Sequence, residues 1–307
     1  MLDKGIEALR EQKALFALID PVVEDPIASA QAFDRLVDLE RRRLPTTALP
    51  KDKRPYLVDL GCFDRSERQI ASLLRRALEE ALGEHDRESV QPRSVCAFIS
   101  APGVDLTRLA SQMARACVLV AHTRRRVLFR YWDPRIASQL PRLLGDDFWG
   151  GQLRRLQIDA WWCYDGAKSP PELAVSTASS AEPLAGDASG GPTHLTEAQF
   201  GKLAVLSWAN RIAGLAPGWE LDETPALRAL EDISARALNH GLTDEADILR
   251  FALAALSIHP EFDRHPHVAR TMAETREFAR TMQGWSPEFI DQLKRGEWKP
   301  SDAGQGQ

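Results

Sequence analysis

The 307-residue sequence lacks features that mark several large classes of protein. It holds only four cysteines, at wide and unpatterned spacing, which argues against a disulfide framework and favours buried free thiols in a reducing compartment. No run approaches the roughly 18 consecutive apolar residues that a membrane-spanning helix needs. Residues 1–20 lack the basic start and long apolar stretch of a signal peptide. We therefore expect a cytoplasmic protein without a membrane span.

An excess of positive charge is also missing. The chain has 39 Lys and Arg against 44 Asp and Glu, a formal net charge of −5 at pH 7. Short arginine runs occur at 41–43 and 124–126, but no basic stripe interleaved with aromatic residues accompanies them. This balance argues against a nucleic-acid partner.

Motifs that carry known chemistry are absent as well. The sequence has no GxxxxGK phosphate loop, no GxGxxG, no GxSxG and no HExxH. Gly150 and Gly151 form an isolated pair that we interpret as a turn. His259, His265 and His267 form the one histidine cluster, and its two prolines favour a stiff, solvated loop over a metal site. We assign no catalytic, cofactor-binding or metal-ligating residue and expect that the protein is not an enzyme.

What the sequence does contain is an alternation of apolar runs and helical stripes in its first half. Apolar spacings of three and four predict helices over Ser66–Leu82, with Ser66 and Gln69 as a capping box, and over Asp105–Cys117. Short apolar runs bounded by Pro, Gly or charge predict strands. These runs are Leu15–Ile19, Tyr56–Leu60, Val95–Ser100 and Leu156–Tyr164.

The segment from Val118 to Arg135 predicts a hairpin that leads into a helix. Val118–Thr123 and Val127–Trp132 are apolar on either side of three arginines, which is typical of two strands joined by a tight turn. Asp133 is a good N-cap and Pro134 fits the first helical position, so a helix should run from there to Leu144.

Composition divides the chain in two. Asp165–Thr193 is dominated by Ala, Ser, Gly and Pro, which predicts a flexible linker. We therefore expect a mixed α/β lobe with a small sheet over 1–164 and an all-helical lobe over 194–307, with a short disordered tail. The fold class is α+β. Helix starts or spans in the second lobe are predicted at Thr196 with Gln199, Thr224-Pro225 (ending at Gly241), Thr243, Val268–Met282 and Ser286-Pro287.

Two carboxylates follow apolar runs directly, in Asp20-Pro21 and Asp133-Pro134. They could line a site, but a cap at each strand-to-helix junction explains both more simply. Arg130 lies in an apolar run, where strand alternation would direct it opposite to Phe129 and Tyr131. An arginine there needs a carboxylate, so we predict a structural ion pair with Asp133 or Asp20.

Aromatic residues gather in the second part of the first lobe. They are either core residues, the usual outcome, or anchors of a protein interface, in which Trp and Tyr are enriched. The candidates for interface contact are Trp149, Trp161 and Trp162.

Three segments stand in order along the first lobe: Leu15–Asp20 (LFALID), Arg54–Leu60 (RPYLVDL) and Phe129–Arg135 (FRYWDPR). Together they resemble a bacterial family formerly catalogued as a domain of unknown function and now associated with type VI secretion adaptor and chaperone proteins (Tap/TEC type). That family has a strand ending in LIDG, a P-[WY]-L-v-x-L strand, and an R-[FY]-x-D-P-R junction after a hairpin. The resemblance covers about half of the chain, and Pro21 after Asp20 departs from the pattern. The signature residues are Asp20, Arg130, Tyr131, Asp133, Pro134 and Arg135.

The resemblance implies a binding protein and no cofactor. Such adaptors bind a cognate toxic effector in the cytoplasm and load it onto the VgrG spike, sometimes with PAAR, for export. The family provides no catalytic residues, so the signature residues are expected to hold the fold rather than touch the effector. Two alternatives stay open: an enzyme with a site between the lobes built on Asp20 and Asp133, and an immunity-like protein that only neutralises a toxin.

Overall fold

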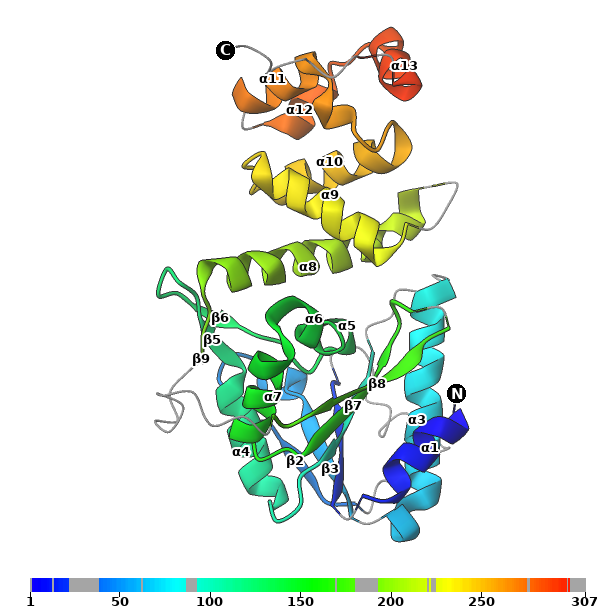
Figure 1. Ribbon diagram of the computed structural model, residues 1–307, viewed down its shortest axis with the longest axis vertical. Helices are drawn as coiled ribbons and strands as arrows, with labels where there is room; N and C mark the ends of the chain where they lie inside the picture. The colour runs from blue at the N-terminus through cyan, green and yellow to red at the C-terminus, as the bar shows by residue number, and fades with distance from the viewer. Residues whose placement is uncertain are drawn as a thin grey trace. The chain divides into compact units, whose positions relative to one another are not determined.

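The chain folds into two units, unit 1 over Met1–Lys202 and unit 2 over Leu203–Gln307. The computed structural model describes residues 2–12, 14–21, 39–61, 63–86, 93–168, 170–179, 193–219, 221, 225–274, 277–296 and 298. Unit 1 is built around an antiparallel sheet and unit 2 is helical (Figure 1), which is the expected α+β class.

Six described strands of unit 1 form one antiparallel sheet in the order β2-β3-β1-β4-β7-β8. Their bounds are β1 Leu15–Ile19, β2 Arg41–Arg43, β3 Tyr56–Gly61, β4 Val95–Ser100, β7 Ala160–Asp165 and β8 Glu172–Thr177. The predicted strands β1, β3 and β4 are confirmed. β1 and β4 are buried along their whole length because helices cover both faces of the sheet, so each reads as an unbroken apolar run.

One face of the sheet is covered by α1 (Leu2–Arg10) and α3 (Phe63–Asp86). Leu9 of α1 and the α3 stripe that includes Ile70 and Leu74 pack against alternate residues of the strands. The predicted helix is present, but it begins three residues before Ser66, so the capping box placed there is wrong.

The other side carries α4 (Leu106–Ala116), α5 (Pro134–Ala137), α6 (Leu140–Leu144) and α7 (Asp146–Arg155). Asp105 caps α4 by accepting a hydrogen bond from the Arg108 amide, and Cys117 ends the helix, as predicted. One helix was expected between Asp133 and Leu144; the structure has two, α5 and α6.

The Gly150-Gly151 pair lies inside α7, so its interpretation as a turn is wrong. Gly150 serves close packing instead. A Cβ at Gly150 would lie 2.9 Å from the backbone nitrogen of Ser179 and 3.1 Å from the carbonyl oxygen of Thr177, whereas one at Gly151 would meet nothing within 4 Å. The missing side chain lets α7 approach the end of β8.

The prediction of a linker over Asp165–Thr193 is wrong for its described part. β8 pairs with β7 at every residue from Glu172 to Thr177 and forms an edge of the sheet. Composition hid this strand because its small residues, among them Ala174 and Ser176, need no apolar burial at a sheet edge. The boundary between the units falls at Lys202/Leu203 instead. Residues 180–192 and the expected C-terminal tail, 299–307, lie outside the described residues.

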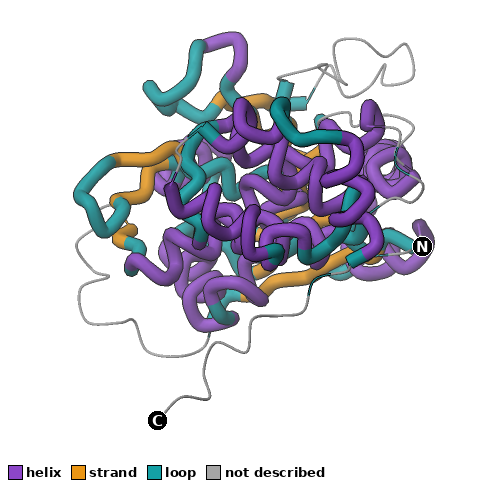
Figure 2. Tube along the Cα trace, turned by 90° about the horizontal axis from the view of Figure 1, so that it is seen from above, coloured by secondary structure: helices purple, strands orange, loops and turns teal. Residues whose placement is uncertain are grey.

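A second, small sheet contains the predicted hairpin, in the order β6-β5-β9. β5 (Val118–Val120) pairs antiparallel with β6 (Arg126–Leu128) and parallel with β9 (Thr193–His194). Figures 1 and 2 both show these strands at the left margin, away from the long strands of the six-stranded sheet. The second strand of the hairpin ends at Leu128, four residues earlier than expected.

Unit 2 packs its helices around one apolar core centred on Phe251, Phe262 and Phe278. Gly241, at φ 77°, is the residue after the C-cap of α9, as predicted. Its amide donates to Leu238, and the Leu242 amide donates to Ala237, which completes a Schellman motif. The helices from the unit boundary onward are α8 Glu197–Leu215, which crosses that boundary, η4 Ala216–Trp219, α9 Leu227–Asn239, α10 Glu245–Ser257, η5 Phe262–Arg264, α11 Pro266–Glu274, α12 Phe278–Met282 and α13 Pro287–Arg295.

Most helix starts in this half follow their sequence signals. Thr196 and Gln199 exchange both hydrogen bonds of a capping box ahead of α8. Asp244, one residue after the predicted Thr243, caps α10. Ser286 caps α13, with Pro287 at the first helical position, as predicted. The single helix expected over Val268–Met282 is instead the pair α11 and α12.

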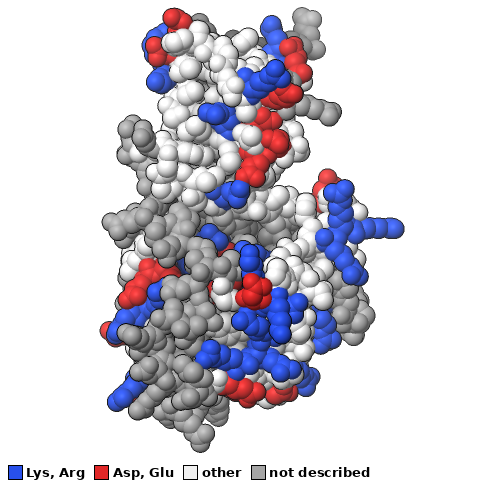
Figure 3. Space-filling model, turned by 180° about the vertical axis from the view of Figure 1, so that it is seen from behind, with Lys and Arg blue, Asp and Glu red and all other residues white. Residues whose placement is uncertain are grey.

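None of the helices in the described part of the chain is long and apolar enough to cross a membrane. Charge is unevenly spread over unit 1. Figure 3 shows Lys and Arg side chains gathered over one face of this unit, with few acidic side chains between them.

Candidate functional site

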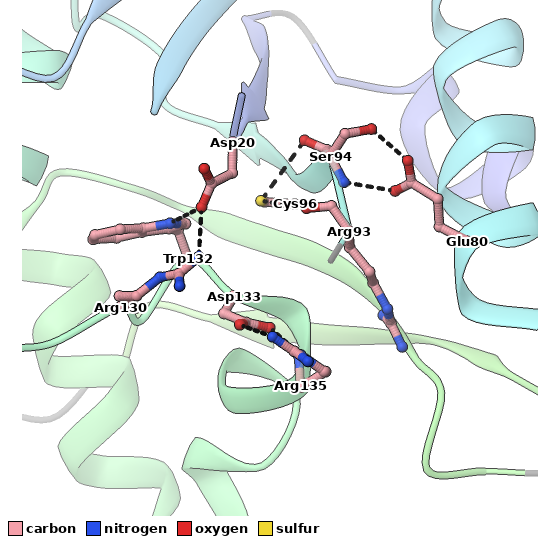
Figure 4. A network of polar contacts seen from close by, with 9 residues as sticks. All are labelled: Asp20, Glu80, Arg93, Ser94, Cys96, Arg130, Trp132, Asp133 and Arg135. Atoms are coloured by element: carbon pink, nitrogen blue, oxygen red, sulfur yellow. Dashed lines mark hydrogen bonds and ion pairs between the residues drawn. The ribbon is translucent and has the colours of Figure 1, made fainter. Parts of the chain in front are cut away.

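The signature residues meet where β1 ends. Asp20 follows β1 directly, and its carboxylate oxygen Oδ2 accepts hydrogen bonds from Arg130 Nη2 at 2.9 Å and from Trp132 Nε1 at 2.7 Å (Figure 4). The Asp20 side chain is 4% exposed, and that of Arg130 is 36% exposed. The predicted ion pair of Arg130 is therefore present, with Asp20 as its partner.

Arg130 does not lie on a strand, so the predicted alternation with its neighbours is wrong. The chain turns at Arg130, where the Asp133 amide donates to the Arg130 carbonyl at 2.9 Å. This turn directs the guanidinium to Asp20 and brings its Cζ within 5.9 Å of the centroid of the Trp132 ring. A cation above an indole ring is attracted by the ring quadrupole, so the two donors to Asp20 also stabilise each other.

Tyr131 and Trp132 fasten this turn to its surroundings. The Tyr131 hydroxyl donates to the Met113 carbonyl of α4 at 2.9 Å, and the ring packs at 5.7 Å from that of Trp132. Burial raises the pKa of the Tyr131 hydroxyl well above its usual value, so the group remains a donor at neutral pH. Through these two side chains the turn joins α4 to β1.

Asp133 caps α5, with Pro134 at the first helical position, as predicted. Its two carboxylate oxygens also accept from Arg135 Nε at 2.9 Å and Nη2 at 2.7 Å, a bidentate pair. Burial of the Asp133 carboxyl raises its pKa, but the hydrogen bonds and charge of Arg135, with a further contribution from Arg130, outweigh burial and lower the pKa overall. Asp133 is therefore a charged carboxylate with both oxygens engaged.

A neighbouring group of polar contacts ties α3 to β4, and no pattern in the sequence predicts it. The Glu80 carboxylate accepts from the backbone amides of Ser94 at 2.9 Å and Val95 at 3.1 Å, and from the Ser94 hydroxyl. Arg93 donates to the carbonyl oxygen of Tyr164 on β7. Glu80 fits into the helical pattern as an ordinary polar residue, so only the fold reveals its contact with β4.

The chemistry open to this cluster is limited. Burial first, then the nearby carboxylate of Asp20, raises the pKa of the Cys96 thiol well above the usual value, which keeps it in the poorly nucleophilic thiol form. Asp20 and Asp133 are each held by an arginine from the same turn region. Such charge-assisted pairs position a chain segment.

The tryptophans proposed as interface anchors are core residues. Trp149, Trp161 and Trp162 are 2%, 1% and 4% exposed. Trp149 and Trp161 pack edge to face at 5.8 Å beside Tyr131, and Trp162 packs against the opposite face of the sheet. Strand alternation in β7 divides the two neighbouring tryptophans between the two cores. None of the three presents its ring to a partner.

The histidine segment is solvated only in part: Glu261 and His267 are exposed, whereas His265 is buried. His265 is 9% exposed, and its ring lies 5.2 Å from that of Phe289. Asp263, between the histidines, is buried and accepts from Arg236 and from His240 Nε2. Burial raises the pKa of Asp263, but the hydrogen bond from His240 and the charge of Arg236 lower it overall. Within the described residues, no group of three or more His, Cys, Asp or Glu side chains is placed to hold a metal ion.

Comparison with known proteins adds no relative. No protein-family model, no curated protein and no solved structure matches this chain.

Proposed function

We propose that the protein is a cytoplasmic adaptor that binds a cognate type VI secretion effector and delivers it to the VgrG spike, and that it catalyses no reaction. The proposal begins from the resemblance of three sequence segments to that adaptor family. It assigns the protein a binding role, with a macromolecule as its partner and no cofactor.

The observation that carries the proposal is that the three segments adjoin in the fold. Leu15–Ile19 and Tyr56–Gly61 are the neighbouring antiparallel strands β1 and β3. The third segment is joined to the end of β1 through the two hydrogen bonds that Asp20 accepts. Segments separated by as many as 112 residues thus form one structural unit. A set of motifs that jointly builds one part of a fold is more specific than three separate short matches.

The environment of the carboxylates favours this proposal over an enzyme. Asp20 and Asp133 are buried and engaged by Arg130 and Arg135, so a catalytic role would require breaking ion pairs that hold the turn together. A buried donor left without its carboxylate acceptor costs about 1–3 kcal/mol. The signature residues therefore fit a scaffold better than a reaction centre.

The test is co-expression of the affinity-tagged full chain with the effector encoded beside its gene, and separately with the neighbouring VgrG. We expect the tagged chain to retain the untagged cognate effector through purification. An untagged effector from another gene cluster should be lost. Retention of neither the cognate effector nor VgrG would refute the proposal.

A protein that only neutralises a toxin would behave differently in cells. It would protect against the effector yet leave the effector's export unchanged when its gene is deleted. An adaptor is needed for export, so the deletion should abolish secretion of the effector while other cargo is still exported.

A further inference from the structure

The β5–β6 hairpin has an open edge. Ala121 donates from its amide to the Arg125 carbonyl at 2.9 Å, and the Phe129 amide donates to the Cys117 carbonyl at 2.7 Å. Because hydrogen-bonded and non-hydrogen-bonded pairs alternate in an antiparallel ladder, Val127 directs its peptide groups toward β5.

The peptide groups of Arg126 and Leu128 then point away from β5. β6 is the outer strand of its sheet, and within the described residues no strand pairs with this outer side. The amide and carbonyl of each of these two residues are thus available to a further extended chain.

The hairpin is also strongly basic. Arg124, Arg125 and Arg126 are exposed, and no carboxylate among the described residues forms an ion pair with any of them. Arg130, by contrast, has an acidic partner in Asp20. Three neighbouring guanidinium groups without a counter-charge favour an anionic partner.

The turn keeps an arginine where backbone geometry disfavours it. Arg124 lies at φ 61°, the third residue of a three-residue loop that normally carries glycine or asparagine. A side chain in this left-handed region costs about 1–2 kcal/mol. A strained residue of this kind at an exposed tip points to a role for its side chain. Figure 2 shows the turn, in teal, projecting at the left margin.

The surroundings favour a polypeptide over other occupants. Leu128 is 39% exposed and adds an apolar contact beside the open peptide groups. A second copy of this chain would bring three arginines against three arginines, which repel. Stacking of single-stranded bases would need exposed aromatic rings, and the aromatic residues that follow the hairpin, Tyr131 and Trp132, are buried.

We propose that the outer edge of β6 binds an acidic, extended segment of the partner protein by strand addition. The arginines of the turn pair with its carboxylates, and the peptide groups of Arg126 and Leu128 with its backbone. The inference rests on the proposed function, since it names the surface of the adaptor that contacts a partner.

The experiment measures fluorescence anisotropy with the full chain and a labelled dodecamer peptide of alternating Glu and Val. We expect saturable binding that weakens by about tenfold or more in the Arg125→Glu/Arg126→Glu variant, because two charge-assisted contacts are lost. The matched control is Arg228→Glu/Arg270→Glu, which makes the same charge change at exposed arginines of unit 2 and should leave binding unchanged. A Lys-Val dodecamer should not bind.

Two further variants separate the backbone and side-chain contributions from loss of folding. Leu128→Pro removes an outward amide without removing a hydrogen bond to β5, so it should weaken binding, whereas Leu128→Ala should retain most of it. Arg124→Gly removes one charge and relieves the backbone strain. It should weaken binding while the melting temperature holds or rises.

The results distinguish the inference from the function on which it rests. Absence of peptide binding, equal binding by Arg125→Glu/Arg126→Glu, or tighter binding of a single-stranded DNA dodecamer would overturn the inference. If the Arg125→Glu/Arg126→Glu protein still retains the cognate effector and VgrG as wild type does, the inference fails and the adaptor function stands. If the peptide behaves as expected but wild type retains neither protein, the adaptor function fails and the binding edge stands.

Discussion

Replacing Asp20 with alanine should destabilise unit 1 more than replacing its ion-pair partner Arg130 with leucine. The Asp20 carboxylate accepts the Trp132 indole at 2.7 Å inside the protein, and hydrogen bonds to a charged group contribute about 1.5–3 kcal/mol. Its removal also leaves the buried indole N–H without this acceptor. The expected loss in unfolding free energy is about 2–4 kcal/mol.

Arg130 contributes less because its side chain is 36% exposed and keeps water around it. A partly solvated ion pair contributes about 1 kcal/mol or less. Arg130→Leu should therefore lower stability or solubility measurably but by a smaller amount. Asp20→Asn should fall between the two variants, because its amide oxygen still accepts from Trp132 while the charge is lost.

The assay is chemical and thermal unfolding followed by tryptophan fluorescence, with Asp263→Asn as a variant that perturbs unit 2 and so identifies its transition. For a unit of this size, 3 kcal/mol corresponds to a drop in melting temperature of roughly 6–12 °C. An Asp20→Ala protein that melts like wild type, or an Arg130→Leu change that costs more than Asp20→Ala, would refute the account of this junction.

Three further outcomes are expected. Gly150→Ala should lower the unfolding free energy by about 1–3 kcal/mol, because its Cβ would collide with the backbone at Ser179. Gly151→Ala, where a Cβ meets nothing, should be neutral or stabilising by up to about 1 kcal/mol. Equal melting temperatures of the two variants would contradict the close packing at Gly150. The pKa values of Asp133 and Asp263 are lowered in the folded protein, so the contribution of each carboxylate to stability is complete above about pH 4 and disappears as the pH falls through its lowered pKa. Urea midpoints that stay constant down to pH 2 would argue against the ion pairs of both residues. Three buried thiols should resist iodoacetamide at pH 8 in the folded protein and react after unfolding, as read by mass spectrometry, since burial raises their pKa values; fast labelling of the native chain would contradict this. These thiols belong to Cys96, Cys117 and Cys163.

The parts of the fold that could be predicted are those whose signal is local. β1 and β4 are unbroken apolar runs because they are covered on both faces. The N-cap and the apolar stripe of α4 both lie within about a dozen residues of sequence, so a local pattern predicts this helix. β8 could not be found this way. It is held by backbone pairing with β7, and its apolar alternation is only two residues long, Leu173 and Val175, among small or polar, half-exposed side chains.

The candidate site was predictable to the same degree. An arginine in an apolar run requires a carboxylate, so the sequence predicts an ion pair for Arg130. The choice between Asp20 and Asp133 depends on the turn at Arg130, which brings it to a residue 110 positions earlier in the chain. The role of Trp132 as a second donor to Asp20 left no trace in the sequence. The sequence leaves the tryptophans open between core and interface, because composition cannot tell an anchor from a core ring.

The most direct measurement of the central claim is the amount of the neighbouring effector in the culture medium, with and without this gene, during active type VI secretion. The account predicts that deletion removes the effector from the medium while it persists in cells, that other cargo is still exported, and that the wild-type gene restores export. Undiminished export of the effector from the deletion strain would contradict it.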